Sequence, residues 1–141
     1  MQSRKAFTVI ETTVVVAVMA ALTAIALPRA AGFIDRIEVR GAVAEIESLF
    51  SLARHAAIAR GARVTLEIDP STSTISVHAP SGLLRSREIG EAHGVLLSAN
   101  RTTITYSPIG LGYGAANSSL IVSRGNVVDT VVVSRLGRVR H

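Results

Sequence analysis

The stretch that decides the fold is FTVIETTVVVAVMAALTAIAL, residues 7–27, in which Glu11 is the single charged residue. An α-helix needs about 20 predominantly apolar residues to cross the hydrocarbon core of a bilayer, and this stretch has that length. It therefore predicts a membrane-spanning helix, which we expect over residues 7–28.

The charges that flank this stretch predict its orientation. Arg4 and Lys5 precede it, and Arg29 follows it. Because basic residues favour the cytoplasmic side, we expect the N-terminus in the cytoplasm and the rest of the chain in the periplasm or outside the cell. The apolar run is longer than the roughly 7–15 residues of a conventional signal peptide. Two alternatives stay open here: conventional signal cleavage near Ala30 and Ala31, and a plain signal anchor.

A second helical segment follows Pro28, a residue that can kink a helix because it removes a backbone hydrogen bond. From Phe33 to Arg60, apolar residues recur at steps of about three or four, with charged residues between them. Gly61 suits the C-terminal end of this helix, so residues 29–61 are predicted to form its amphipathic half. We expect its buried face to consist of Ile34, Ile37, Ala44, Leu49, Leu52, Ala56 and Ala59.

Beyond Gly61 the spacing of apolar residues changes from the three- or four-residue steps of a helix to the two-residue steps of a strand. Apolar and polar residues alternate from Val64 to Asp69, and the DPSTS turn leads to a second short run at residues 75–77, which predicts a β-hairpin. Further strands are expected at residues 95–98, 102–106, 119–123 and 127–134.

The predicted fold class is α+β. A long N-terminal helix, transmembrane in its first half and amphipathic in its second, packs on a mostly antiparallel β-sheet. This sheet is expected to form a β-rich globular head over residues 62–141, which ends in a basic C-terminal tail.

Composition narrows the function classes. The 141-residue chain has no cysteine, which removes disulfides, thiolate metal sites and cysteine nucleophiles together. Aromatic residues make up 4% of the chain, so stacking on nucleobases is not expected. The four histidines lack metal-ligand spacing, and no cluster supplies a nucleophile with a base. We therefore expect no enzyme activity, no catalytic residue, no metal site and no cofactor.

The segment RKAFTVIE, residues 4–11, closely resembles the class III signal of type IV pilins and pseudopilins when it is read with the apolar run behind it. The resemblance implies a leader of residues 1–6, which a prepilin peptidase removes between Ala6 and Phe7. It also implies N-methylation of Phe7. In this family the residue before the cut is usually Gly; here it is Ala6, so processing depends on whether the peptidase accepts alanine.

Glu11 is the other conspicuous feature of this segment. A charged side chain at the centre of a membrane helix costs about 2.5–3.5 kcal/mol unless it is paired or neutralised. The family resemblance implies a partner: the N-terminal amine of a neighbouring subunit, so that the pair sets the register during assembly. The alternative is an interfacial carboxylate within reach of lipid headgroups, since Glu11 lies four residues after Phe7.

The C-terminal half of the sequence indicates a particular group among the type IV pilins and pseudopilins. TITYSPIGLGYG, SSLIVSRG, VVDTVVVS and the closing LGRVRH look like the GspH/FimT group of minor pilins and pseudopilins. The resemblance implies an inner-membrane protein with a single membrane span and a periplasmic head. It also implies assembly with other pilin or pseudopilin subunits into a type IV pilus or a type II secretion pseudopilus.

The two branches of this group differ in what the head contacts. In the branch that binds DNA during natural transformation, a C-terminal Gly-Arg-x-Arg motif contacts phosphates, and residues 137–140 match it residue by residue. Such contacts are sequence-independent and salt-sensitive. The candidate DNA-binding residues are Arg138 and Arg140, with Arg135 and Arg124 widening the patch. The alternative is a GspH-type pseudopilin of type II secretion that contacts cargo and whose basic tail is only solvated.

Overall fold

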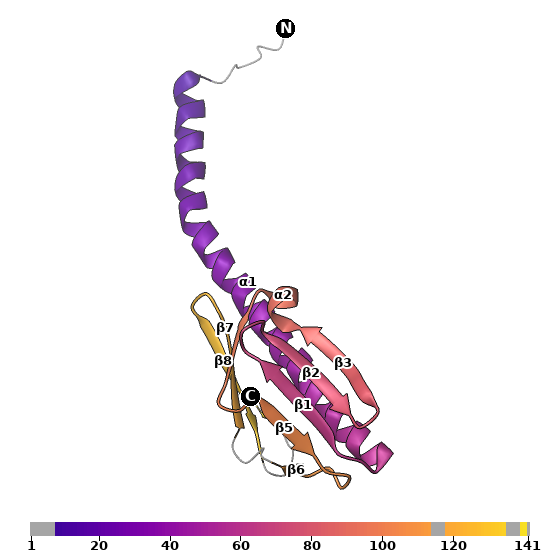
Figure 1. Cartoon of the computed structure of the whole chain (residues 1–141). Coiled ribbons are helices and arrows are strands. Elements are labelled where there is room, and N and C mark those ends of the chain that lie inside the picture. The colour runs from indigo at the N-terminus through magenta and orange to yellow at the C-terminus, as the bar shows by residue number, and fades with distance from the viewer. Residues whose placement is uncertain (1–7, 114–117, 135–138, 141) are drawn as a thin grey trace. The chain divides into compact units, whose positions relative to one another are not determined.

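The computed structural model describes residues 8–113, 118–134 and 139–140 (Figure 1). Ala6, Phe7, Arg135 and Arg138, which the sequence singled out, lie outside the described residues. The chain divides into two compact units, residues 1–34 and residues 35–141, and each is described by itself. The second is called the head unit below.

The first unit contains the N-terminal half of helix α1 (Val9–Arg60). Thr8 caps this helix, because its Oγ1 accepts a hydrogen bond from the Glu11 N–H at 3.2 Å. The Thr-x-x-Glu spacing is that of a capping box. Threonine hydroxyls within the apolar stretch donate to carbonyls about one turn back, as Thr13 does to Val9 at 2.8 Å. Their polar groups are therefore satisfied inside the helix, as a membrane helix requires.

Pro28 does not end this helix, since α1 is assigned as one element of 52 residues. The apolar side chains of the first unit are largely exposed; Val9 is 82% and Ile10 is 76% exposed. By length and composition, α1 is a candidate membrane span, and its most apolar window has no buried residue.

In the head unit, α1 buries a face that differs from the predicted one. Of the predicted residues only Leu49 is buried, whereas Ile37 is 52% and Leu52 is 37% exposed. The predicted and the observed face each contain three alanines, so the residue types alone did not distinguish them; the sheets that pack on α1 decide which side is buried. The buried residues, spaced as one helical face requires, are Val39, Ala42, Val43, Ile46, Leu49, Phe50, Ala53 and Ala57.

The end of α1 agrees with the sequence prediction. The helix stops at Arg60, and Gly61 has a φ of +57°, in the left-handed region that glycine enters without strain. The Ala62 N–H then donates to the Ala57 carbonyl at 3.2 Å, which satisfies an orphan carbonyl of the last turn.

Two antiparallel sheets share one hydrophobic core with α1. The first has the strand order β3-β2-β1-β5-β6 and the second has the order β4-β7-β8-β9. The strands of the first sheet are β1 (Val64–Asp69), β2 (Thr74–Ala79), β3 (Gly82–Glu88), β5 (Thr103–Tyr106) and β6 (Gly112–Tyr113). Those of the second are β4 (Leu96–Ala99), β7 (Ser118–Arg124), β8 (Val127–Val133) and β9 (Val139–Arg140). A short helix, α2 (Ile89–His93), joins β3 to β4.

The α+β fold class and the predicted hairpin are confirmed. Thr65 of β1 lies opposite His78 of β2, and Asp69 lies opposite Thr74. The four other predicted strands are found as β4, β5, β7 and β8, with ends within one residue of the predicted ones.

Strand β3 and helix α2 were not predicted. Arg85 and Arg87 of β3 lie opposite the buried Val77 and Ile75 of β2, so charged residues occupy the inward-facing positions of this edge strand. Inward-pointing charges protect an edge from pairing with other chains, and they also remove the apolar alternation on which strand prediction depends.

Tyr106 is the largest fully buried side chain in the described part of the head unit. Burial raises the pKa of its phenol to about 12, although the positive charge of Arg54 acts in the opposite direction and lowers the pKa. Its Oη has no hydrogen-bond partner among the described residues. A buried hydroxyl without a partner costs about 1–3 kcal/mol.

We therefore expect Tyr106→Phe to raise the free energy of unfolding of the head unit by about 1 kcal/mol, since it removes the hydroxyl and keeps the ring. Urea denaturation at neutral pH measures this change. Tyr106→Ala, which empties the same space, should instead lower the free energy of unfolding by about 3–5 kcal/mol. A phenylalanine variant less stable than the wild type would show that the hydroxyl has a partner.

Candidate functional site

Glu11, the first candidate residue, lies in the first turn of α1. Its backbone N–H is capped by Thr8, and the helix dipole favours a carboxylate in this position. The carboxylate itself forms no ion pair among the described residues. Sequence analysis missed the capping box, although the Thr-x-x-Glu spacing signals it. Local structure thus explains why Glu11 is compatible with the start of a helix but gives its charge no partner.

Arg140 lies on β9, the edge strand of the second sheet, opposite Val132 of β8. Val139 packs against the hydrophobic core, whereas Arg140 is exposed. Because successive residues of a strand point to opposite faces, the Arg140 guanidinium is directed away from the core. It is accessible to a phosphate group.

Arg124 is placed differently. Its Nε donates to Asp35 Oδ1 at 2.9 Å, and its Nη1 donates to the His93 carbonyl. The guanidinium therefore ties β7 to α1 and α2 inside the head unit.

The sequence predicted that Arg124 widens a patch around Arg140, but the structure does not bring these two arginines together. They pair with Val127 and Val132 of β8, five residues apart, which separates them by roughly 17 Å along the strand direction at about 3.4 Å per residue, and they lie on opposite sides of β8.

A group of ion pairs between α1, β3 and α2 was not found by sequence analysis. Glu45 Oε1 accepts from Arg87 Nε at 2.6 Å, and its Oε2 lies 3.1 Å from His93 Nε2. The other ring nitrogen, His93 Nδ1, lies 3.0 Å from Glu38 Oε2. Only a doubly protonated imidazole donates to both carboxylates at once. This ring therefore connects α2 to two positions of α1 that lie seven residues, or about two turns, apart.

Gly41 permits the close approach of His93 to α1. A Cβ at this position would lie 3.1 Å from His93 Cε1, tighter than an ordinary contact. Burial raises the pKa of Glu45, but the hydrogen bonds and charges of Arg87 and His93 outweigh burial and hold its pKa below the usual value.

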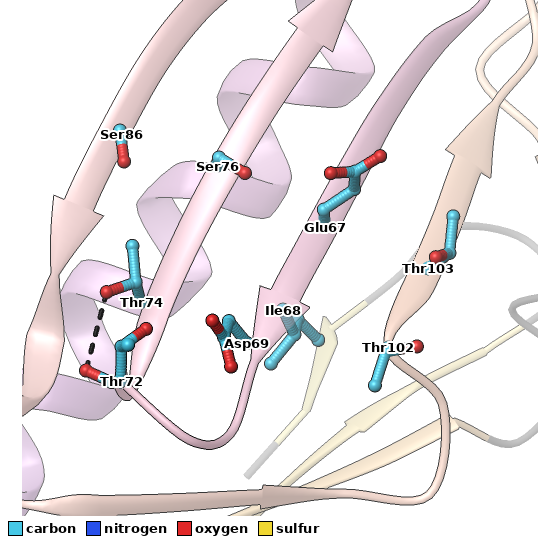
Figure 2. A pocket seen from close by; sticks show the side chains of 9 residues that line it. All are labelled: Glu67, Ile68, Asp69, Thr72, Thr74, Ser76, Ser86, Thr102 and Thr103. Carbon is cyan, nitrogen blue, oxygen red and sulfur yellow. Dashed lines mark hydrogen bonds between the residues drawn. The ribbon is translucent and has the colours of Figure 1, made fainter.

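A shallow hollow of about 380 Å³ lies on the outer face of the first sheet (Figure 2). Hydroxyl and carboxylate oxygens dominate its lining, and no basic side chain contributes to it. Asp69 accepts from the Ser71 hydroxyl at 2.5 Å and from the Ser71 N–H at 2.9 Å; these bonds hold its pKa below the usual value. This carboxylate therefore stabilises the β1–β2 turn. The hollow is lined by Glu67, Ile68, Asp69, Thr72, Thr74, Ser76, Ser86, Thr102 and Thr103.

Beside this hollow, a serine, a histidine and a glutamate lie close together. His78 Nε2 lies 3.1 Å from Ser76 Oγ and 3.7 Å from Glu67 Oε2. In a catalytic triad the carboxylate and the nucleophile contact different nitrogens of the histidine ring. Here Glu67 and Ser76 both contact Nε2 of His78, so the three residues do not form such a triad. Among the described residues, no group of three or more His, Cys, Asp or Glu side chains is placed to hold a metal ion.

An apolar helix of this length that continues into an antiparallel two-sheet head is the architecture of type IV pilin-like subunits. The model of the family described as type II transport protein GspH matches residues 42–137, more than half of the chain. The chain therefore belongs to the GspH family, which contains minor pilins and pseudopilins. The match begins inside α1, so it does not include Glu11 or the segment before it.

Two crystal structures of the type IV minor pilin FimU from Pseudomonas aeruginosa share this fold. The structure in space group P21 has a TM-score of 0.63 and 16% identity, and the match covers 77% of this chain and 90% of that one. The structure in space group P65 has a TM-score of 0.59 and 13% identity, covering 72% and 90%. No match was found among curated protein sequences.

The lowered pKa of Glu45 predicts how the free energy of unfolding of the head unit depends on pH. Its folded-state pKa lies below the ordinary 4.5, so the carboxylate stabilises the fold above about pH 4.5 and this contribution is lost as the pH falls through the folded-state pKa. Glu45→Gln should lower the free energy of unfolding at about pH 7 by roughly 1–2 kcal/mol and flatten its decline below about pH 4.5.

Urea denaturation at several pH values measures this effect. Glu67→Gln is the matched control, because it also removes one carboxylate but lies on the solvent side of the first sheet, outside the Arg87–Glu45–His93 group. Equal destabilisation by both substitutions at neutral pH would contradict the role assigned to Glu45.

Proposed function

We propose that this chain is made as a precursor and becomes a filament subunit. A prepilin peptidase cuts between Ala6 and Phe7, and Phe7 is then N-methylated. The apolar segment of residues 7–28 holds the subunit in the inner membrane with its head in the periplasm. The subunit then joins other pilin or pseudopilin subunits in a type IV pilus or a pseudopilus.

The observation that carries this proposal is the exposed apolar surface of the first half of α1. Val9, Ile10 and Met19 are 82%, 76% and 63% exposed. A continuous apolar surface of this kind is unfavourable in water. Lipid covers it before assembly, and neighbouring helices cover it in a filament, where the core is built from the same kind of surface.

In this proposal Glu11 fixes the position of each subunit relative to its neighbour in the filament. Its carboxylate forms no ion pair within the described part of its own subunit, and an unpaired charge among packed apolar helices costs several kcal/mol. The N-terminal amine of Phe7 in a neighbouring subunit is the partner that the pilin resemblance implies. A subunit out of register leaves both charges unpaired, so assembly favours the correct position.

We expect Glu11→Gln to leave membrane insertion and cleavage intact and to reduce incorporation into filaments by about tenfold or more, because it removes the charge but keeps a residue that suits the capping box. Immunoblots of sheared filaments and of membranes measure the two quantities. Thr8→Ala is the complementary control, since it removes the cap and keeps the charge. Assembly that survives Glu11→Gln and fails in Thr8→Ala would assign Glu11 a capping role alone.

We further propose that the head binds double-stranded DNA through Arg138 and Arg140, with Arg135 adding to the basic charge. The supporting observation is the exposed position of Arg140 on edge strand β9. Arg138 is included because it belongs to the Gly-Arg-x-Arg motif of residues 137–140. Arg124, engaged with Asp35, contributes to the basic field from a distance. The alternative remains a GspH-type secretion pseudopilin that contacts cargo and no DNA.

The head unit titrated with mixed-sequence duplex DNA at about 0.05 M and about 0.2 M salt should bind more weakly at the higher concentration. Arg138→Ala/Arg140→Ala should weaken binding and reduce the slope of log K against log salt by about 2, since each phosphate contact contributes about 0.9. The matched control is Arg85→Ala/Arg101→Ala, which removes two exposed arginines elsewhere. Absence of binding at the lower salt concentration would leave the secretion pseudopilin as the better assignment.

A further inference from the structure

One end of the head unit carries a surface that is both basic and apolar. It lies where α1 ends and β5 turns into β6, at the lower end of the head unit in Figure 1. Ile109 is 73%, Tyr113 is 57%, Ile58 is 47% and Leu111 is 41% exposed. We call this surface the tip patch and define it as Arg54, Ile58, Arg63, Ile109, Leu111 and Tyr113.

The residues of the tip patch are in contact across three segments. A Cβ at Gly110 would lie 2.9 Å from Ile58 Cδ1 and 3.2 Å from Arg54 Nε, so the β5–β6 loop rests directly on the end of α1. Arg63 Cζ lies 5.6 Å from the centre of the Tyr113 ring, within cation–π range. These contacts link the loop to α1, and Arg63 to β6, at the same end of the head unit.

Hydrogen bonds fix the loop that presents the patch. The Ser107 N–H donates to the Leu111 carbonyl at 2.8 Å, and the Leu111 N–H donates to Ser107 Oγ at 3.0 Å. The Gly110 N–H also donates to the Ser107 carbonyl at 2.8 Å. A loop held in this way loses little conformational freedom on binding, which favours an interaction surface.

The arginines of the tip patch lack acidic partners in the described part of the chain. No salt bridge there involves Arg54 or Arg63, although five others are formed. A surface that combines unpaired arginines with an aromatic ring and aliphatic side chains has the composition of a protein–protein contact. Its partner should present carboxylates.

The same chain presents such carboxylates at the other end of the head unit, near α2. Ser86, Arg87, Glu88, Glu91 and Ala92 line a hollow of about 550 Å³, which we call the acidic hollow. Its one basic residue, Arg87, is already bound to Glu45 at 2.6 Å.

Glu88 and Glu91 in this hollow have no salt bridge among the described residues and face each other. The hydrogen bond to Glu91 and its charge raise the pKa of the Glu88 carboxyl. Arginine side chains from outside would relieve this repulsion.

We propose that the tip patch of one copy of this chain binds the acidic hollow of a second copy, with Arg54 and Arg63 facing Glu88 and Glu91. Figure 1 places α2 and the β5–β6 loop at opposite ends of the head unit, so the contact is head-to-tail. A contact between two different surfaces of the same molecule leaves one of each surface free, so further copies can add and form a filament unless the rotation closes a ring. Duplex DNA would match the arginines but not the exposed apolar side chains, so a protein partner fits better.

This contact concerns the head unit alone, so it can be tested separately from the roles of Glu11 and Arg138. Every buried hydrophobic residue described lies between Val39 and Val133, inside the head unit, which therefore has its own core. Sedimentation velocity of the head unit over a range of concentrations should show reversible association. Association should weaken between about 0.1 M and about 1 M salt, as the Debye length falls from about 10 Å to about 3 Å.

Charge reversal identifies the two surfaces. Arg63→Glu and Glu91→Arg should each weaken self-association by about tenfold or more, because like charges then meet. An equimolar mixture of the two variants should associate again, since the basic tip of one meets the acidic hollow of the other. Arg101→Glu, a charge reversal outside both surfaces, should leave association unchanged.

Recovery in the mixture also shows that both variants are folded. A wild-type head unit that stays monomeric at low salt and high concentration would overturn the proposal. So would self-association that survives both reversals, or a mixture that fails to recover. Loss of duplex DNA binding in Arg63→Glu, with a head unit that is monomeric throughout, would reassign the tip patch to nucleic acid.

Discussion

The contact on which the rest of the structure depends is the burial of one face of α1 against two sheets. Eight residues from Val39 to Ala57 form this face, and several are alanine or valine, so the helix axis lies close to both sheets. Strands β1, β2, β5 and β7 then bury one side of the pleat and leave the other side more exposed, which fixes their register. The same helix carries exposed apolar side chains in its first half, so α1 contributes to the core of the head unit in its second half and is a candidate membrane span in its first.

Around this core, ion pairs decide how the smaller elements are attached. Arg87 and His93 reach Glu45 from β3 and α2, and Arg124 reaches Asp35 from β7. These interactions fasten the least apolar parts of the head unit to the helix, where few hydrophobic contacts are available. They also explain why Arg124, which looked suited to DNA, is directed into the molecule. Among the described residues, Arg140, the two arginines of the tip patch, and Glu88 and Glu91 of the acidic hollow form none of these ion pairs.

The family assignment and the structure support different parts of the functional argument. The family match covers the distal part of α1 and most of the sheets, and the FimU structures share the fold at low identity. The N-terminal signal lies outside that match. Its interpretation depends on the spacing of Ala6, Phe7 and Glu11 and on the apolar surface behind them. The proposals of assembly through the helix and of binding through the head therefore depend on different parts of the chain.

The sequence by itself determined the apolar helix, the strands with alternating residues and the family resemblance, because these depend on local periodicity and on motifs of a few residues. It did not determine the buried face of α1, since that face is chosen by the sheets that pack on it and not by the size of its side chains. It also missed strand β3, whose inward positions carry arginines. The ion pairs could not be predicted from the sequence, because Arg87–Glu45 and Arg124–Asp35 join residues that are 42 and 89 positions apart. Only the tertiary structure brings such residues together and shows which charges are left for a partner.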